Sequence, residues 1–473
     1  MNNPHVVIIG GGITGLVAAY RLHQLYASET EGAISCTLVE KEGRLGGKIQ
    51  TKRTDAYTLE VGPDSIFTRK PAGVEFMKEI GLHDTMIPVS SQGGTLVWHQ
   101  GKLHPLPPGI QTGVPSDLSA FAKTKLVSLQ GKARALLEVL LPHVPYPDDV
   151  SVGEFLRKRL GNEIVDTLAA PLLSGIYAGD IDHLSLQATM PMLRELYEKN
   201  ARLLLGAVRQ RKRVSSVSRL SGPMFITLEH GLEQLVDHVV SQITEYTDVK
   251  VNTQALDIQL TSDGKYYIHI VEEGRESLVP ADAIILATPA FDSAVLLGGL
   301  EIDVRKLKTI RYASTATVSF GYTRPSYAFS LVGSGFLVPR HEGMSITACT
   351  VVSNKWVHAS KKGTLLIRCY VGRDGDEEAV TWDDEKLIRK VKEDLEKTTG
   401  LKDEPEFVHI KRWESSMPQY DVGHLQRLEQ IDQEIAKLPG IFLAGAAYRG
   451  MGIPDCIQDA TRVSQHVKNY LHE

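Results

Sequence analysis

A glycine-rich segment near the start of the chain carries the clearest chemical signal. Gly10, Gly12 and Gly15 fit the pattern G-x-G-x-x-G directly after the apolar, β-branched run Val6–Ile9. In such a loop one glycine permits a tight turn, one lets the backbone approach a pyrophosphate, and one allows a helix to pack closely on a strand. The pattern therefore predicts a dinucleotide site at a helix N-terminus. The residues expected to bind there are Gly10, Gly11, Gly12, Ile13, Thr14 and Gly15.

An acidic residue follows at the end of the next predicted strand. Cys36–Val39 is a second apolar run, and Glu40 comes directly after it, 25 residues beyond Gly15. A carboxylate at this place can accept hydrogen bonds from ribose hydroxyls. The separation exceeds the usual ~20 residues, and we expect the polar stretch 28–32 to be a small insertion that explains the excess. The alternative is a glycine-rich turn beside a solvated glutamate.

A second glycine-rich loop directly after Glu40 indicates which dinucleotide is bound. A nicotinamide site does not need such a loop, whereas a flavin that stays bound through turnover must be held from several sides. The segment Gly43–Lys48 resembles the R-x-G-G element of the FAD-containing amine oxidase superfamily. This resemblance implies that Arg44 contacts phosphate directly or through another residue. It also places the following residues at the flavin: Gly46, Gly47, Lys48, Gly62, Pro63, Asp64 and Ser65. A solvated loop is the alternative for Arg44 and Lys48.

The C-terminal region supplies a second strong signal. Ile441–Gly445 reads as a strand that meets a glycine turn, and a final helix is expected to run to Tyr470. A helix that begins after Met451-Gly452-Ile453 would aim its positive end at the pyrimidine side of the flavin and stabilise negative charge on the reduced ring. The cofactor contacts expected in this region are Gly445, Met451, Gly452 and Ile453.

The stretches between these signals differ in their periodicity. Residues 116–219 repeat apolar positions every three to four residues, as helices do, whereas 290–410 alternate as in an antiparallel sheet. Between them, the amphipathic segment Gly231–Ile243 and three strands return the chain to the nucleotide domain. Further candidate cofactor contacts are Ala255, at the adenine edge, Thr288 and Trp413.

These patterns predict a fold of the α/β class combined with α+β. A Rossmann-like FAD-binding domain is expected from residues 1–68, 222–290 and 411–473. A substrate-binding domain with a mixed or antiparallel sheet would comprise 69–115 and 291–410. A helical domain, 116–221, is a candidate membrane-facing part.

Composition excludes several other classes of protein. The chain has 473 residues and a formal net charge of −5, so no global basic field marks a nucleic-acid binder. Its four cysteines form no C-x-x-C pair, which argues against disulfides and zinc; no metal site is expected, and the protein is expected to be cytoplasmic. No apolar run approaches the ~18 residues of a spanning helix, and the N-terminus lacks a signal-peptide pattern. Eight Lys or Arg against two acids at 194–219 predict a solvated face or, alternatively, a surface for acidic lipid, partner or substrate.

Over nearly its whole length the sequence resembles the bacterial protoporphyrinogen and coproporphyrinogen III oxidases. The most specific blocks are residues 5–16, 62–65, 171–180 and 452–457, and the block 171–180 separates this family from amine oxidases and carotenoid desaturases. The resemblance implies FAD-dependent six-electron oxidation of a porphyrinogen by dioxygen, with hydrogen peroxide as by-product, in haem biosynthesis. Coproporphyrinogen III is the favoured substrate and protoporphyrinogen IX the second choice. Contact with a downstream haem-pathway enzyme or a peripheral membrane contact stays open, as does the oligomeric state.

The resemblance also points to substrate-binding residues. It implies that the Gly175 carbonyl faces the pyrrole N–H groups and that Ile176 packs on the tetrapyrrole. Asp64 and Lys70 would lie near the substrate mouth, where Lys70 could pair with a propionate. No catalytic side chain is assigned, because the flavin accepts the hydride. For each of these residues a purely structural role is the alternative.

Three other functions are compatible with parts of the pattern. A flavoprotein disulfide reductase would need a redox cysteine pair and a second G-x-G-x-x-G, and Gly333-Ser334-Gly335 lacks the third glycine. A flavin amine oxidase or related desaturase is a closer rival, which substrate assays would separate. A non-catalytic carrier with this fold is disfavoured by the intact glycine loops.

Overall fold

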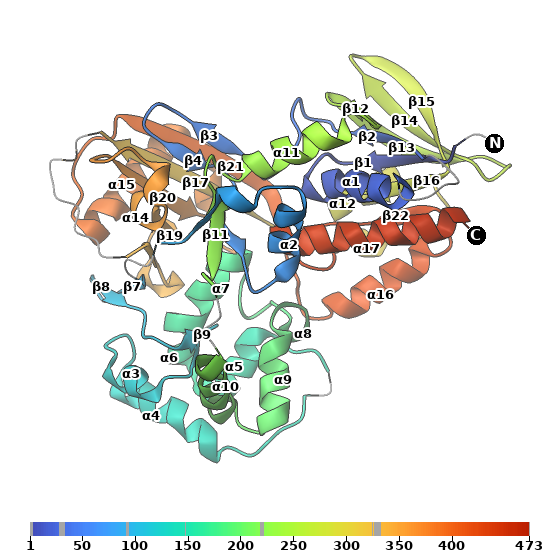
Figure 1. The fold of residues 1–473 in the computed structure, drawn as a ribbon. Helices are drawn as coiled ribbons and strands as arrows, with labels where there is room; N and C mark the ends of the chain where they lie inside the picture. The colour runs from blue at the N-terminus through green and yellow to red at the C-terminus, as the bar shows by residue number, and fades with distance from the viewer. Residues whose placement is uncertain are drawn as a thin grey trace.

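A computed structural model describes residues 3–27, 34–90, 94–146, 148–217, 222–323, 325 and 333–472. The insertion expected at 28–32 lies outside these residues. Elements that are far apart in the sequence pack together in space. Figure 1 shows a group of helices at the lower end and two regions of sheet above them.

Five strands form a parallel sheet in the order β12-β2-β1-β16-β22. They are β12 (Thr247–Lys250), β2 (Ser35–Val39), β1 (His5–Ile9), β16 (Ala283–Leu286) and β22 (Ile441–Leu443). A parallel strand covered on both faces needs apolar side chains at successive positions. The continuous run Val6–Ile9 meets this need at the centre of the sheet. The predicted Rossmann-like part of the fold is confirmed.

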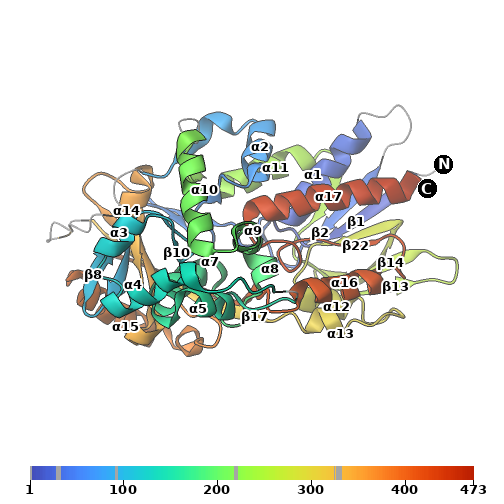
Figure 2. The same cartoon turned by 90° about the horizontal axis from the view of Figure 1, so that it is seen from below.

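Alternate side chains of β1 enter two hydrophobic cores on opposite faces of this sheet. Val6 and Ile8 pack in one core, and Val7 and Ile9 in the other. The first core is covered by α1 (Ile13–Ala27), α2 (Pro71–Glu79), α11 (Glu233–Ile243) and α17 (Ile453–His472). The second is covered by α12 (Ala290–Leu296), α16 (His424–Ile435) and a small sheet of β13 (Thr253–Leu260), β14 (Tyr266–Glu272) and β15 (Arg275–Ala281). In Figures 1 and 2, α1 and α17 lie side by side.

A second large sheet has seven strands in the order β21-β17-β20-β19-β18-β7-β8. Its neighbours are antiparallel except for β18 and β7. The strands are β21 (Phe407–Pro418), β17 (Tyr312–Tyr322), β20 (Leu365–Val371), β19 (Ile346–Val351), β18 (Gly335–Leu337), β7 (Thr95–His99) and β8 (Lys102–Pro105). Helix α15 (Asp384–Thr399) packs its apolar face here; the Asp383 side chain caps its N-terminus, and the helix ends at Gly400. The domain boundary proposed at residue 411 falls inside β21; the domain division stays a prediction.

The segment predicted to be helical forms a bundle around a core of its own. Its helices are α3 (Leu118–Lys123), α4 (Leu129–Leu136), α5 (Val152–Leu160), α6 (Asn162–Ile164), α7 (Ala170–Tyr177), α8 (Leu186–Thr189), α9 (Pro191–Asn200) and α10 (Leu203–Val217). The buried Glu138 carboxylate pairs with Arg159 and accepts the backbone N–H groups of Leu203 and Leu204, which begin α10. This pairing satisfies donors that a helix N-terminus leaves free.

Shorter elements complete the chain. They are β3 (Thr51–Arg53), β4 (Thr58–Glu60), β5 (Ile66–Phe67), β6 (Met86–Pro88), β9 (Ile110–Gln111), β10 (Val114–Pro115), β11 (Phe225–Leu228), α13 (Arg305–Lys308) and α14 (Val352–Lys355). Within the described ranges, no helix has both the length and the apolar composition needed to cross a bilayer.

A buried histidine makes the stability of the fold depend on pH. His424, at the start of α16, is fully buried, stacks on Tyr420 and donates from Nε2 to the carbonyl of Tyr448. Its Nδ1 has no partner among the described residues. Burial lowers the pKa of His424 to about 4, because a second ring proton would lie unpaired in the core.

We predict that His424→Gln weakens the acid sensitivity of the fold. The unfolded histidine takes up a proton near pH 6.5 and the folded one near pH 4, so this stabilisation is complete above pH 6.5 and is lost as pH falls toward 4. At pH 5 the loss is about 2 kcal/mol. Thermal unfolding at pH 8 and pH 5 should show a smaller drop in Tm for the variant than for the wild type. Equal drops would contradict the prediction.

Candidate cofactor and substrate site

The two glycine-rich loops predicted from the sequence lie against each other. The N–H of Gly46 donates to the carbonyl of Gly11 over 2.8 Å, and Gly12 and Gly46 form a parallel bridge. A Cβ built on Gly12 would meet nothing within 4 Å, so the backbone at this position borders open space beside the N-terminus of α1. That arrangement fits the phosphates of a dinucleotide, which need exposed backbone N–H groups and no side chain in the way.

Close packing explains the glycine at position 15. A Cβ on Gly15 would overlap the carbonyl oxygen of Gly10, and its next neighbour would be Ile8 in β1. Only a residue without a side chain lets α1 approach the strand so closely. The first helical turn, which starts with the bond from the Leu16 N–H to the Gly12 carbonyl, is thereby fixed against the sheet.

Glu40 holds the first loop from the end of β2. Its carboxylate accepts the N–H of Gly11 over 2.7 Å and the N–H of Glu42 over 2.8 Å. The Glu40 carbonyl accepts the N–H of Thr253, and Ala255 follows two residues along β13. Glu40 and Ala255, the residue expected at the adenine edge, are therefore close in space.

Arg44 contacts protein groups. Its guanidinium donates to the carbonyls of Gly47 and Ile49 and pairs with Glu233 of α11 over 2.8 Å. The side chain thus ties the second glycine loop to a helix of the same domain. Of the two roles expected for Arg44, this geometry favours action on phosphate through the loop that it holds.

Lys48 lies in the second glycine loop, beside the flavin candidates. Its ammonium donates to the carbonyl of Ser416, and burial of the ammonium lowers the pKa of Lys48. The residue as a whole is nevertheless exposed to solvent. Nearby, the Trp413 indole N–H donates to the carbonyl of Val61 over 3.2 Å, which fixes the residue before Gly62.

The start of α17 meets the first glycine loop. Gly445 lies next to Thr14 and donates its N–H to Asp459 of α17. Asp455 accepts the N–H of Gly452 and pairs with Lys70 over 2.6 Å. The α17 N-terminus, Thr14 and the loop 445–452 thus lie close together. Thr288 also reaches this region, since its methyl group would lie 3.5 Å from a Cβ on Gly10.

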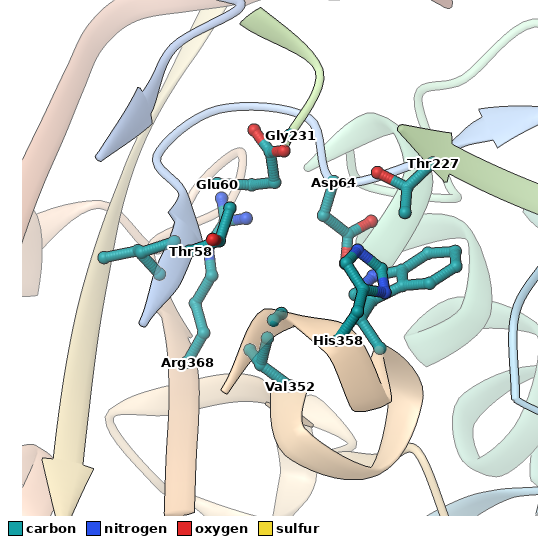
Figure 3. Close-up of a pocket in the computed structure, with 11 residues that line it drawn as sticks. Thr58, Glu60, Asp64, Thr227, Gly231, Val352, His358 and Arg368 are labelled. Atoms are coloured by element: carbon teal, nitrogen blue, oxygen red, sulfur yellow. The ribbon is translucent and has the colours of Figure 1, made fainter. Parts of the chain in front are cut away.

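Glu60, Asp64 and Arg368 are charged residues that line a small cavity, as Figure 3 shows. Burial would raise the pKa of Asp64, but Lys355, at 2.7 Å, and Arg368 outweigh it and hold the pKa near 2. Burial raises the pKa of Glu60 to about 7, even though it accepts hydrogen bonds from Leu232 and Thr51.

Arg368 is the main cation of this cavity and is missing from the sequence-based candidates. It is 4% exposed and donates from Nη2 to the carbonyl of Gly62 over 2.6 Å. Its Nε and Nη1 have no partner among the described residues. Because β20 lies far from residue 62 in the sequence, no local spacing could have identified Arg368.

The block 171–180 ends α7 at a larger cavity of about 640 Å³. Ser174, Gly179 and Asp180 line it, opposite Arg340 and His341 from the seven-stranded region. Gly175 lies in the last helical turn, where carbonyls lack later N–H partners within the helix. Ile176 is 55% exposed. A π-helical turn, Val165–Ala169, precedes α7; such turns often occur at functional sites.

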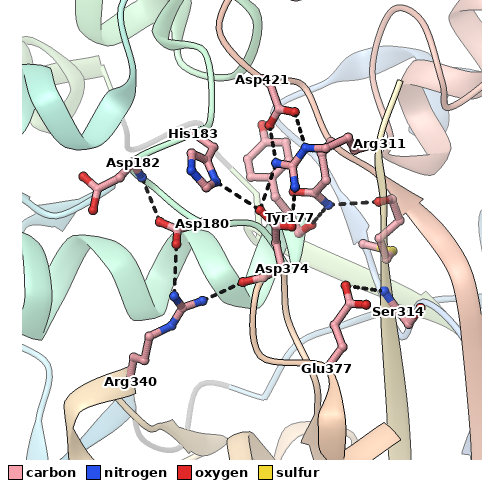
Figure 4. Close-up of polar contacts among 12 residues, drawn as sticks. Tyr177, Asp180, Asp182, His183, Arg311, Ser314, Arg340, Asp374, Glu377 and Asp421 are labelled. Atoms are coloured by element: carbon pink, nitrogen blue, oxygen red, sulfur yellow. Dashed lines mark hydrogen bonds and ion pairs between the residues drawn. The ribbon is translucent and has the colours of Figure 1, made fainter. Parts of the chain in front are cut away.

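A charge network fixes the end of this block against the rest of the protein. Arg311 pairs with both Asp374 and Asp421 over 2.8 Å, and Arg340 pairs with Asp180 over 3.0 Å. Figure 4 shows these side chains converging from the helical bundle, the strands and the loop before α16. The carbonyl of Ala178 accepts the N–H of Asp374 at the same point. The network therefore sets how the helical bundle sits above the cavity.

The predicted residues thus form two groups. The cofactor candidates from residues 10–15, 40–48 and 445–453 meet around the two glycine loops. Gly175 and Ile176 lie on α7, at the end that borders the larger cavity, whereas Asp64 and Lys70 are each paired with a protein charge.

Comparisons with known proteins place the chain in a family. The model of flavin-containing amine oxidoreductases matches residues 13–468. The coproporphyrinogen III oxidase of Bacillus subtilis is 39% identical over 99% of this chain and 98% of its own length. That of Staphylococcus aureus is 35% identical over 98% of both.

Solved structures agree with this placement. A crystal structure from Exiguobacterium sp. 255-15, assigned to protoporphyrinogen oxidase, covers 100% of both chains with a TM-score of 0.87 and 35% identity. A reduced UDP-galactopyranose mutase, at 17% identity and a TM-score of 0.74, shares the fold. The family predicted from the sequence is confirmed. The chain belongs to the flavin-containing amine oxidoreductases and is an FAD-dependent oxidoreductase.

Proposed function

We propose that this chain oxidises a porphyrinogen, with coproporphyrinogen III favoured over protoporphyrinogen IX, in haem biosynthesis. The observation that carries the proposal is the match to a coproporphyrinogen III oxidase over 99% of this chain and 98% of the relative. The cavity at the end of α7 supports it, because its volume lies within the roughly 300–1,000 Å³ of small-molecule sites.

The reaction balances with dioxygen as oxidant. One porphyrinogen and three O₂ give one porphyrin and three H₂O₂, so that six electrons and six hydrogens leave the macrocycle in three two-electron steps. Bound FAD supplies the hydride acceptor, a chemistry that no side chain provides. The chain's own residues bind and orient both molecules and exclude water.

Each group of residues has a proposed task in FAD binding. The backbone of the loop 10–15 and the N-terminus of α1 hold the pyrophosphate, and Glu40 accepts from a ribose hydroxyl. Arg44 holds the second loop, and Lys48 lines the flavin. The N-terminal end of α17 stabilises negative charge on the reduced ring.

A substitution at Gly12 tests the proposed cofactor site. We predict that Gly12→Val folds but loses FAD, because its side chain would enter open space in the protein and occupy the place of the pyrophosphate. Gly299→Val is the matched control, since a Cβ there also meets nothing within 4 Å. Flavin absorbance per chain should fall at least ~10-fold in the first variant and stay unchanged in the second. Full retention of FAD by Gly12→Val would refute the assignment.

Substrate binding is proposed for the end of α7 and for Lys70. The Gly175 carbonyl would accept from pyrrole N–H groups, and Ile176 would cover the tetrapyrrole. Lys70 is 51% exposed and Asp455 only 12%. A half-exposed ammonium can turn toward a propionate while Asp455 keeps its bond to Gly452. Asp64, held by Lys355, shapes the same mouth.

Removing the charge of Lys70 should weaken substrate binding. We predict that Lys70→Met raises KM for coproporphyrinogen III about tenfold with kcat little changed, because a contact made equally in ground and transition states affects KM alone. Lys78→Met removes an exposed lysine in the last turn of α2 and should have wild-type kinetics. Lys70→Arg, which keeps the positive charge, should have a KM close to that of the wild type. A fall in kcat at constant KM would point to a structural role instead.

The substrate itself is tested by a parallel assay. Aerobic incubation with coproporphyrinogen III and with protoporphyrinogen IX should produce porphyrin fluorescence and H₂O₂ above the autoxidation rate, faster with the four-propionate substrate. A primary amine should yield no H₂O₂. Oxidation of the amine alone would overturn the proposed function, and a preference for protoporphyrinogen IX would overturn the substrate choice.

The setting of the reaction is also proposed. We place the enzyme in the cytoplasm, with dioxygen as acceptor and a downstream haem-pathway enzyme receiving the product. Of the basic run 194–219, residues 218 and 219 lie outside the described ranges; the rest covers most of α9 and all of α10. Some of its cations pair within the protein, such as Arg194 with Glu198 and Arg211 with Asp117. A peripheral membrane contact through this run stays a proposal.

A further inference from the structure

Three side chains with metal-ligating atoms converge beside the β7–β8 hairpin. His99 ends β7, and His341 and Glu342 lie in the 3-10 turn Arg340–Glu342. The ligand atoms of these three residues all lie within 4.8 Å of one another. Because the two histidines are more than two hundred residues apart in the sequence, no local spacing reveals the cluster.

The separations approach those of a metal site. His99 Nδ1 lies 3.1 Å from Glu342 Oε1, and His341 Nε2 lies 3.6 Å from the same oxygen. Tetrahedral Zn²⁺ binds nitrogen and oxygen at about 2.0–2.1 Å, which places neighbouring ligand atoms about 3.3–3.4 Å apart. Two of the three separations are therefore close to the required value. The His341 side chain is 45% exposed and can rotate to adjust the third.

The other two ligands are held in place. The side chains of His99 and Glu342 are each 13% exposed. The N–H of Gln100, in the turn of the hairpin, donates to Glu342 Oε1 over 3.0 Å. A carboxylate fixed by the backbone and a buried imidazole cost little ordering entropy when an ion binds.

The cluster opens onto the cavity at the end of α7. His99 and His341 line that cavity together with Ser174 and Asp180. Three cationic groups also line it, but each is paired: Arg157 with Asp182, Arg340 with Asp180, and Arg373 with Asp376. Their positive charge is therefore largely compensated at the place where an ion would bind.

We propose that His99, His341 and Glu342 bind one divalent transition metal, Zn²⁺ by preference, with its open position toward the cavity. Two imidazoles and one carboxylate suit Zn²⁺, and a site with three protein ligands leaves a fourth position for water or another ligand. A carboxylate is the class of ligand that this position would take from the cavity. The site lies beyond the proposed oxidase function and does not depend on it.

The test measures metal binding by the untagged holoenzyme without any substrate. After dialysis against a chelator, Zn²⁺ is titrated by calorimetry and Co²⁺ by its visible d–d absorption, recorded as a difference spectrum. The wild type should bind one equivalent of each, and added propionate should shift the Co²⁺ spectrum. Flavin content, measured in every sample, reports that the fold is intact.

Three variants decide the outcome. His341→Ala should lower the affinity at least ~10-fold, since loss of even a supporting residue costs 10–100-fold, and Glu342→Gln, which keeps the side-chain shape, should do the same. His83→Ala removes an exposed histidine that also lies beside a carboxylate, Asp84, and should bind like the wild type.

Failure of the wild type to bind one equivalent, or unchanged binding in both triad variants, would overturn the proposal. If His341→Ala loses its flavin, Glu342→Gln alone decides. If propionate leaves the Co²⁺ spectrum unchanged, the proposed open coordination position is wrong. None of these results bears on porphyrinogen oxidation, which is measured separately.

Discussion

The structure depends on the close approach of backbone to backbone around the loop 10–15. Gly15 leaves no room for a Cβ against the carbonyl of Gly10, and Gly46 donates its N–H to Gly11. Helix α1, the second glycine loop and the end of β2 are all positioned by these contacts. Without them the α1 N-terminus would have no fixed place relative to Glu40 or to the start of α17.

Polar side chains around the glycine loops hold the backbone of the site by further hydrogen bonds. Glu40, Arg44 and Asp459 each form a hydrogen bond with a backbone group of the site. Arg368 does the same for Gly62 from the neighbouring sheet. Beyond them, Arg311 and Arg340 bring the end of α7 to the same region through carboxylates of other segments. Charge pairing thus connects the helical bundle to the region of the seven-stranded sheet.

Features encoded within a few residues could be predicted from the sequence. The glycine loop and the acid after β2 depend on local spacing, and both appear in the structure. Contacts between distant segments could not be predicted in this way. The partner of Lys70 is 385 residues away, and that of Lys355 is 291 residues away. The proposed boundary at residue 411 shows the same limit, because only pairing with β17 reveals that β21 continues through it.

The strand order of the parallel sheet has a consequence for synthesis. β1 (His5–Ile9) lies at the sheet centre, yet its second neighbour β16 (Ala283–Leu286) is made more than 270 residues later. At roughly 5–20 residues per second, a ribosome needs tens of seconds to cover that distance. During this time one edge of β1, which is apolar from Val6 to Ile9, has no native neighbour. Pairing with β2 covers only the other edge of β1, so the centre of the sheet is completed late in synthesis.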